Sequence, residues 1–253
     1  LRMSKKHIIS PHGGKLVNRM RDGLSDDASL VSVTLTERQQ CDLEMLAIGA
    51  LSPLEGFMGD ADFNSVCDNM TLADGTVWPM PITCAVSDEV AGKVKTGDKV
   101  ALRDDDGRFL GTLDVKELFK QDKKKQAAKC YGTEEEAHPG VKVVYEEGDT
   151  CLAGPIDVAV ARHEPMFVEH RLTPVQTRAE FEKRGWNTVS AFQTRNPIHR
   201  AHEYLTKCAQ EITDGLLIHP LMGATKDGDI PGEVRMECYE VLIKNYYHPD
   251  HTL

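Results

Sequence analysis

A polar stretch in the last third of the chain reads Gln193-Thr194-Arg195-Asn196-Pro197-Ile198-His199-Arg200-Ala201-His202-Glu203. The short apolar run 189–192 in front of it predicts a buried strand. Asn196 is a favoured N-cap residue and proline is favoured at the first helical position, so we expect a helix over 197–212. The stretch is therefore predicted to leave a strand, form a short loop and enter a helix at its N-terminus.

Apolar side chains recur at helical spacing through this predicted helix and indicate one buried face. They are Ile198, Ala201, Leu205, Cys208, Ala209 and Ile212. The wider pattern alternates helices and strands: helix 174–184, strand 189–192, helix 197–212, strand 216–218 and helix 232–246. Such alternation predicts an α/β fold with a parallel sheet, in which ligands bind beyond the carboxyl ends of the strands. The loops 193–199 and 219–230 should therefore face one crevice.

The first turn of the predicted helix is rich in cationic side chains, which are Arg195, His199, Arg200 and His202. A helix N-terminus offers unpaired N–H groups and the positive end of the dipole, and these cations would repel one another without an anion. We therefore expect a phosphate or sulfate here. His202 also falls on the apolar stripe, so a buried core histidine is its alternative. Asn196 has a pure capping role as its alternative, and no third ligand at a diagnostic spacing supports a metal-binding histidine pair.

A second loop, 223–231, is rich in glycine and carries Lys226. It lacks the Gly-Lys-Ser/Thr order of a Walker A motif. Lys226 and the backbone of 222–224 are candidates for contact with a nucleotide, and a plain surface loop is the alternative.

The first part of the chain mixes short helices and strands. We expect a strand over 30–33, helices over 36–49, 60–70 and 120–131, a hairpin over 100–115 and a strand over 149–160. Thr36 and Gln39 form a capping box, and Asp106-Gly107 is a hairpin turn. This part is predicted to be a compact α+β or barrel-like domain. Polar and proline residues interrupt the pattern near 162–171, so we place the domains at 1–168 and 169–253.

Composition excludes several classes of protein. The 253 residues are 40% hydrophobic and carry a formal net charge of −10, which argues against a sequence-independent nucleic-acid binder. No apolar run reaches the roughly 18 residues that a membrane span needs, and no N-terminal signal segment is visible. We therefore expect a cytoplasmic protein. The seven cysteines include no Cys-x-x-Cys, which indicates neither a disulfide framework nor a standard zinc site.

The stretch 193–203 resembles the signature of the ATP sulfurylase (sulfate adenylyltransferase) family. Its two histidines are similar to the His-x-x-His of the nucleotidylyltransferase superfamily, although Ala201 stands where many members have Gly. Four other segments resemble the same family in the same order. They are Pro11-His12-Gly13-Gly14, Leu51-Ser52-Pro53-Leu54-Glu55-Gly56-Phe57-Met58, Asp74-Gly75-Thr76-Val77-Trp78-Pro79-Met80-Pro81-Ile82 and His219-Pro220-Leu221-Met222-Gly223.

The resemblance implies a fold and a reaction. The fold is an N-terminal β-barrel-like (PUA-like) domain over 1–168, followed by a Rossmann-like nucleotidylyltransferase domain that begins at 169. The reaction is sulfate plus MgATP giving adenosine 5′-phosphosulfate and pyrophosphate, or its reverse. A sulfate oxygen attacks the α-phosphorus in line, without a covalent enzyme intermediate. The resemblance also implies a homo-oligomer.

Site residues follow from the resemblance position by position. The catalytic residues are Arg195, His199 and His202, and the sulfate ligands are Gln193 and Arg195. The nucleotide-binding residues are Gln193, Thr194, Arg195, Asn196, His199, His202, Leu221, Met222 and Gly223. Mg²⁺ is expected to arrive with ATP, held by phosphates and water and not by a protein cage.

Members of the family carry a later Gly-Arg-Asp-His-Ala-Gly segment that this sequence lacks, so we expect a truncated piece. Two other hypotheses stay open. One is a His-x-x-His nucleotidylyltransferase whose acceptor is not sulfate. The other is a non-catalytic fragment or scaffold module that only binds nucleotide.

Overall fold

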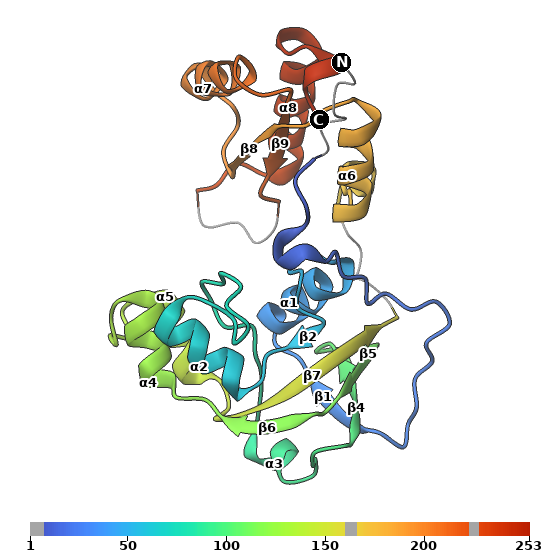
Figure 1. Ribbon diagram of the computed structural model, residues 1–253, viewed down its shortest axis with the longest axis vertical. Helices are drawn as coiled ribbons and strands as arrows, with labels where there is room; N and C mark the ends of the chain where they lie inside the picture. Colours follow the sequence, from blue (N-terminus) through green and yellow to red (C-terminus); the bar gives the residue numbers. More distant parts are fainter. Residues whose placement is uncertain (1–7, 160–165, 223–227) are drawn as a thin grey trace, which may run out of the picture. The chain divides into compact units, whose positions relative to one another are not determined.

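The computed structural model describes residues 8–159, 166–222 and 228–253 (Figure 1). These residues fall into two compact units. Residues 11–159 form one unit, and residues 8–10 group with 166–222 and 228–253 in the other. Each unit is built from its own elements and has its own apolar core.

The unit of residues 11–159 is built on a mixed seven-stranded sheet (Figure 1). Its strands are β1 (Val31–Thr34), β2 (Gly56–Phe57), β3 (Cys84–Val86), β4 (Lys99–Arg103), β5 (Phe109–Asp114), β6 (Glu117–Lys120) and β7 (Thr150–Val158). The order is β1-β4-β5-β7-β2, with β3 and β6 also on β7. Only the β1–β4 pair of these is parallel. The β4–β5 hairpin and the strand at the end of this unit confirm the sequence-based predictions.

The long strand β7 holds this sheet together because four other strands pair with it. Val100, Leu113 and Ile156 are fully buried between the strands and the covering helices. Gly154 allows β7 to approach the end of β5 closely. Its φ is +147°, and a Cβ there would lie 2.0 Å from the carbonyl oxygen of Asp114. Only glycine fits at that crossing.

Five α-helices accompany this sheet in the part of the unit that the structure describes. They are α1 (Glu37–Ile48), α2 (Asp60–Asn69), α3 (Asp88–Ala91), α4 (Lys123–Gln126) and α5 (Pro139–Glu146). The capping box of Thr36 and Gln39 opens α1, and Gly49 closes it in the left-handed region. The helices predicted at 36–49 and 60–70 are confirmed as α1 and α2, and a helix predicted at 120–131 is confirmed as α4 and the helical turn Ala127–Tyr131. The short helices α3 and α5 were not predicted.

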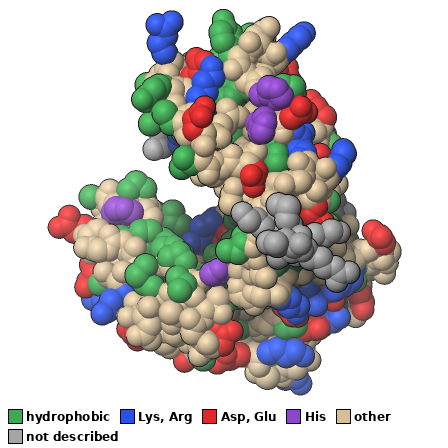
Figure 2. All heavy atoms as spheres, turned by 45° about the horizontal axis from the view of Figure 1, so that its top comes forward, with side chains coloured by type: hydrophobic (Ala, Val, Ile, Leu, Met, Phe, Trp, Pro, Cys, Tyr) green, Lys and Arg blue, Asp and Glu red, His purple; other side chains and the backbone are tan. Residues whose placement is uncertain are grey.

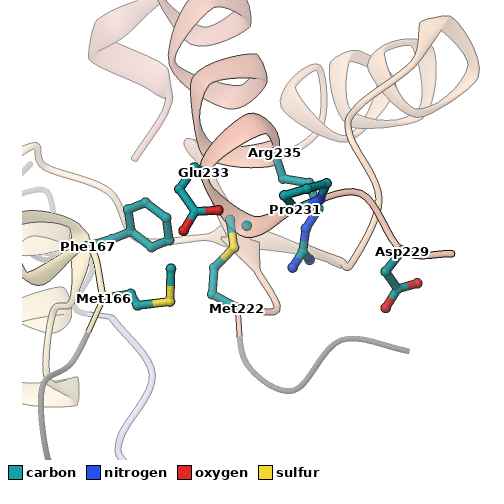
Figure 3. A pocket seen from close by; sticks show the side chains of 8 residues that line it. Met166, Phe167, Met222, Asp229, Pro231, Glu233 and Arg235 are labelled. Atoms are coloured by element: carbon teal, nitrogen blue, oxygen red, sulfur yellow. The ribbon is translucent and has the colours of Figure 1, made fainter. Parts of the chain in front are cut away.

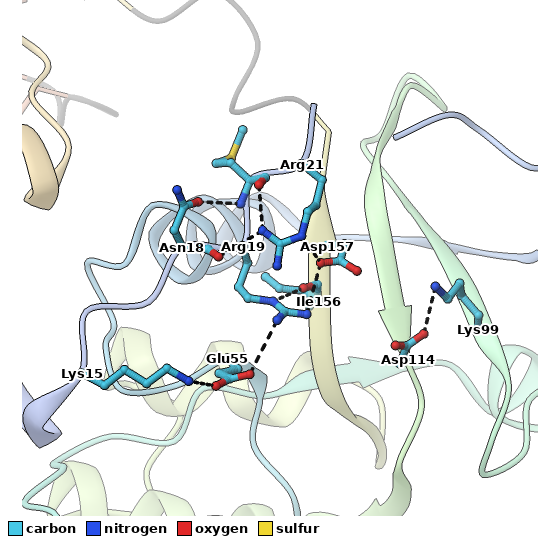
Figure 4. A network of polar contacts seen from close by, with 10 residues as sticks. Lys15, Asn18, Arg19, Arg21, Glu55, Lys99, Asp114, Ile156 and Asp157 are labelled. Atoms are coloured by element: carbon cyan, nitrogen blue, oxygen red, sulfur yellow. Dashed lines mark hydrogen bonds and ion pairs between the residues drawn. The ribbon is translucent and has the colours of Figure 1, made fainter. Parts of the chain in front are cut away.

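A charged network joins the N-terminal segment to β7 (Figure 4). Arg19 donates from Nε to the carbonyl oxygen of Ile156 at 2.6 Å and pairs with Asp157 at 3.1 Å. Arg21 reaches the same Asp157 at 2.9 Å. Glu55 pairs with Lys15 and lies 3.6 Å from Arg19. These contacts anchor a segment that also pairs with the sheet through an isolated bridge between Met20 and Val158.

The second unit is an α/β structure. Its elements are η3 (Val168–His170), α6 (Pro174–Lys183), β8 (Val189–Thr194), α7 (Arg200–Gln210), β9 (Gly215–Pro220), α8 (Gly232–Tyr246) and η4 (Pro249–His251). β8 and β9 are parallel, as the alternation predicted. Leu253 exchanges backbone hydrogen bonds with Leu216 and Ile218 on the other edge of β9, at 2.9 and 2.8 Å. The predicted helices 174–184 and 232–246 are confirmed.

The predicted start of α7 is wrong. The helix begins at Arg200 with His199 as N-cap, and not at Pro197 with Asn196 as N-cap. Asn196 is engaged elsewhere: its N–H donates to Thr194 Oγ1 at 3.1 Å, and its carbonyl oxygen accepts from Tyr239 at 2.6 Å. These contacts hold residues 194–196 in a turn, so the helix starts later.

Of the predicted buried face of α7, Ile198 is buried at 6% exposure, but most of the rest of the prediction is wrong. Leu205 is 58% exposed and Ile212 is 83% exposed, while Ala201 and Cys208 are exposed as well. The helix instead buries Thr206, which is 1% exposed. Figure 2 shows hydrophobic side chains at the surface of both units. Helical spacing identified an apolar stripe correctly, but the residues that the structure describes do not cover it.

Candidate active site

Two loops leave the same edge of the β8–β9 sheet. The strands pair in parallel register, with Gln193 opposite His219 and Thr194 opposite Pro220. The N–H of Leu221 then donates to the carbonyl oxygen of Thr194 at 2.9 Å, which extends the ladder by one bond. The carboxyl ends of the strands therefore bring 193–199 and 219–222 together, as expected for an α/β crevice.

Gln193 and Thr194 occupy the end of β8. Gln193 is exposed, and its Nε2 lies 3.4 Å from Nδ1 of His219 on the neighbouring strand. The hydroxyl of Thr194 lies within hydrogen-bond distance of both the N–H and the carbonyl oxygen of Asn196, at 3.1 and 3.3 Å. Gln193 thus presents a polar side chain at the sheet edge, whereas Thr194 shapes the turn that follows.

Arg195 follows the end of β8, and its guanidinium pairs with the carboxylate of Asp229. The Arg195 side chain is 33% exposed, and its Nε has no hydrogen-bond partner among the described residues. A guanidinium has five donors in a planar fork, so one carboxylate leaves donors for an oxyanion. Arg195 was named from the sequence, but its partner Asp229, which falls in the segment 223–231, was not.

The two predicted histidines lie against each other at the start of α7. His199 caps the helix, because its Nδ1 accepts from the N–H of Ala201 at 3.3 Å. Its ring stacks on that of His202, with centroids 3.8 Å apart and planes 29° apart. Two positive charges at this distance repel by about 4 kcal/mol at an effective dielectric of 20. A nearby anion would offset such a repulsion.

His202 combines features of both of its sequence-based interpretations. Its ring packs 5.4 Å from that of Phe192, and the residue is half-buried. Its buried Nδ1 has no hydrogen-bond partner in the described part of the chain. Buried side-chain polar atoms are normally hydrogen-bonded, so this nitrogen is an exception among the residues that the structure describes.

Two residues of α8 that sequence reasoning missed hold the first loop. Arg235 is 2% exposed and donates from Nη1 to the carbonyl oxygens of Arg195 and Leu221, at 2.9 and 2.8 Å. Tyr239 is also 2% exposed, and its hydroxyl donates to the carbonyl oxygen of Asn196. Burial raises the pKa of Tyr239, so the phenol keeps its proton at neutral pH. Their spacing of four places both on one helix face.

A hollow of about 330 Å³ lies beside these loops (Figure 3). It is lined by Met166, Phe167, Met222, Asp229, Pro231, Gly232, Glu233 and Arg235. Met222 is the one described residue among the sequence-named site residues that lines this hollow, and Leu221 beside it is 51% exposed. Gly223 and Lys226, also named from the sequence, lie outside the described residues.

Two further findings bear on function. In residues 8–159, 166–222 and 228–253, no group of three or more His, Cys, Asp or Glu side chains is placed to hold a metal ion. In the same ranges, no helix is both long enough and apolar enough to cross a bilayer.

Comparison with protein families matches both parts of the chain. Residues 9–161 match the PUA-like domain, and residues 168–253 match the ATP-sulfurylase family. The two matches cover nearly the whole of the described chain.

Similar proteins agree with this division. A sulfate adenylyltransferase of Synechococcus sp. is 49% identical over 97% of this chain and 64% of its own length. One of Acaryochloris marina is 47% identical over 97% of this chain and 65% of its own. The chain thus spans under two thirds of these relatives. A solved structure described as a hexameric APS kinase from Thiobacillus denitrificans has a TM-score of 0.73 at 32% identity, covering 97% of this chain and 46% of that one.

Proposed function

Because this chain belongs to the ATP-sulfurylase family, we propose that it is part of a sulfate adenylyltransferase. The enzyme transfers AMP from MgATP to sulfate, giving adenosine 5′-phosphosulfate and pyrophosphate, or runs the reverse reaction. In this proposal residues 1–168 form the PUA-like domain and 169–253 begin a Rossmann-like nucleotidylyltransferase domain. The protein acts in the cytoplasm as a homo-oligomer, without nucleic acid or membrane as partner.

One observation carries the proposal: Arg195 follows the end of β8, and the stacked pair of His199 and His202 stands at the N-cap and in the first turn of α7. Sulfate and the phosphates of ATP are anions that repel each other, so the reaction needs a local array of cations and N–H donors to bring them together. A strand end followed by a helix N-terminus supplies such an array.

Each side chain has a role in this scheme. Gln193 and Arg195 bind sulfate, since an amide and a guanidinium both donate to oxyanions. His199 and His202 bind the phosphates and stabilise the charge that develops on the α-phosphate. Nucleotide contacts come from both loops, through Thr194, Asn196, Leu221, Met222 and Gly223.

No nucleophile from the protein is needed, because the attacking atom belongs to sulfate. The protein positions the two substrates and neutralises charge on the leaving pyrophosphate. Mg²⁺ enters as part of the MgATP substrate, held by phosphates and water. The ion supplies charge neutralisation at the phosphates.

The alternatives remain testable. A nucleotidylyltransferase with another acceptor would use the same histidines, and a fragment that only binds nucleotide would keep ATP affinity without turnover. The nucleotide-binding fragment is kept as an alternative because the chain spans 64–65% of the length of these relatives.

The deciding experiment is molybdate-dependent ATP cleavage. Molybdate mimics sulfate, and its adenylyl product falls apart, so turnover reports on the site. This chain and a version extended to the length of the relatives are compared, each with Arg195→Ala as control. We expect the extended protein to cleave ATP only with the oxyanion and Arg195→Ala to abolish cleavage. Cleavage at equal rates without the oxyanion would rule out the sulfurylase assignment.

A further inference from the structure

We infer that Arg235 and Tyr239 are positioning residues that set the conformation of both site loops from the buried face of α8. The inference rests on the proposed function of these loops. It assigns no substrate contact to either side chain. Their effect on the site is transmitted through backbone carbonyl groups.

The hydrogen bonds of Arg235 join equivalent points of the two loops. Thr194 and Pro220 are the last paired residues of the parallel ladder. Arg235 binds the carbonyl oxygens of the residues that follow them, Arg195 and Leu221. One guanidinium nitrogen therefore bridges the two segments where the sheet ends. The loops cannot separate or rotate at this point without breaking a charge-assisted hydrogen bond.

Tyr239 extends this restraint to the next carbonyl of the first loop. Its hydroxyl donates to the carbonyl oxygen of Asn196, so consecutive carbonyls of Arg195 and Asn196 are both bound from α8. Carbonyl oxygens repel anions. Binding them to buried donors turns their negative ends toward α8 and away from an anionic ligand.

A buried arginine at position 235 is unfavourable for the stability of the fold, so packing alone does not explain it. It is 2% exposed, its Nε has no hydrogen-bond partner among the described residues, and its hydrogen bonds to those residues end on the neutral carbonyls of Arg195 and Leu221. It also stands in the first turn of α8, at the positive end of the helix dipole. Burying a cation here is unfavourable. Residues that are unfavourable for stability in this way concentrate at functional sites, where the function requires them.

The chain offers a matched control. Arg184 also bridges two carbonyls from Nη1, those of Pro249 and Thr252, at 2.7 and 3.1 Å. It belongs to the same unit, but its carbonyls lie outside both loops. Arg184→Met therefore removes the same kind of bridge without touching the site.

The test is backbone hydrogen exchange of the whole chain, read at 193–199 and 219–222. We expect Arg235→Met to speed exchange in both segments about tenfold or more relative to the rest of the unit. Arg235→Lys should be intermediate, because a lysine lacks the planar fork. Tyr239→Phe should affect only 193–199, and Arg184→Met neither segment.

The inference is overturned if Arg235→Met speeds exchange evenly over residues 166–253, or if Arg184→Met affects the two segments equally. Should Arg235→Met fail to fold, Tyr239→Phe decides alone by its effect on 193–199. In the extended protein we also expect Arg235→Met to raise KM for molybdate, with partial recovery in Arg235→Lys. If the wild type shows no oxyanion-dependent turnover, the proposed function fails, while the exchange measurement still judges this inference.

Discussion

His199 belongs both to the N-cap of α7 and to the stacked histidine pair. These two tasks are separable because asparagine is an equally good N-cap without an imidazole. The chemistry of the side chains singled out Arg195, His199 and His202, and the family resemblance added Gln193. The structure places Gln193 and Arg195 at the end of β8 and the two histidines at the start of α7. What residue chemistry alone did not reveal is their partners, Asp229 and Arg235.

We predict that His199→Asn keeps the fold and lowers oxyanion-dependent ATP cleavage by the extended protein about 100-fold or more, the usual effect of losing one donor to a developing charge. His199→Ala serves as the comparison, because it should lose the same activity and also about 1 kcal/mol of stability with the cap. Thermal unfolding and cleavage rates measure the two effects. Near-normal activity in His199→Asn would mean that the residue is only a cap.

At the scale of elements, local signals predicted helices well. The predicted capping box at Thr36 opens α1, and a capping box at Thr173 opens α6 at the predicted start of that helix. Such motifs depend on hydrogen bonds within four residues, so the sequence contains all that they require. The prediction of where α7 begins was wrong because Tyr239, more than 40 residues away, binds the carbonyl oxygen of Asn196.

The packing of α7 yields a second prediction. Thr206 Oγ1 lies 2.6 Å from the hydroxyl of Tyr247, and both residues are buried. Thr206→Val keeps the shape but leaves the phenol unpaired, so we expect a loss of about 1–3 kcal/mol in the free energy of unfolding. Denaturant unfolding measures it. In the background of Tyr247→Phe the same substitution should cost much less; an unchanged cost would show that the hydroxyl pair does not hold the helix.

The junction between α7 and β9 yields a pH prediction. The pKa of Asp214 lies below its ordinary value of 3.8 because the carboxylate accepts hydrogen bonds from the N–H groups of Asn187 and Thr188. A lowered folded-state pKa stabilises the protein above the unfolded-state value, and this contribution is lost as pH falls through the folded-state pKa.

We therefore expect Asp214→Asn to lower Tm by about 2–4 °C at neutral pH. The difference between variant and wild type should shrink as pH drops below about 4. Calorimetry at several pH values provides the measurement. A difference that stays constant down to pH 2 would contradict the assigned role of the charge.

At the scale of the whole molecule, the two units differ in how they are stabilised. The unit of residues 11–159 has a seven-stranded sheet and a large core, whereas the other has two strands and a small apolar cluster. The second unit also leaves the apolar side chains of Leu205 and Ile212 exposed, so they do not add to its core. Small units bury a smaller fraction of their surface and are correspondingly less stable.

We predict that amides of β8 and β9 exchange with solvent faster than those of β5 and β7 in the intact chain, by 100-fold or more on an order-of-magnitude estimate. Exchange measured by mass spectrometry after proteolysis tests this. Equal protection of the two sheets would mean that the units unfold together, and the small core would then not limit stability.

The sequence by itself determined the elements with local signals, the parallel α/β alternation, and the residues whose chemistry suits an anion site. It also carried the family resemblance over most of its length, which the matches at 9–161 and 168–253 bear out. Only the tertiary structure decided where α7 begins, which of its faces is buried, and which side chains hold the loops. Those outcomes depend on contacts between residues far apart in the chain. A local pattern can show that a side chain is apolar or charged, but only the packed molecule shows what lies against it.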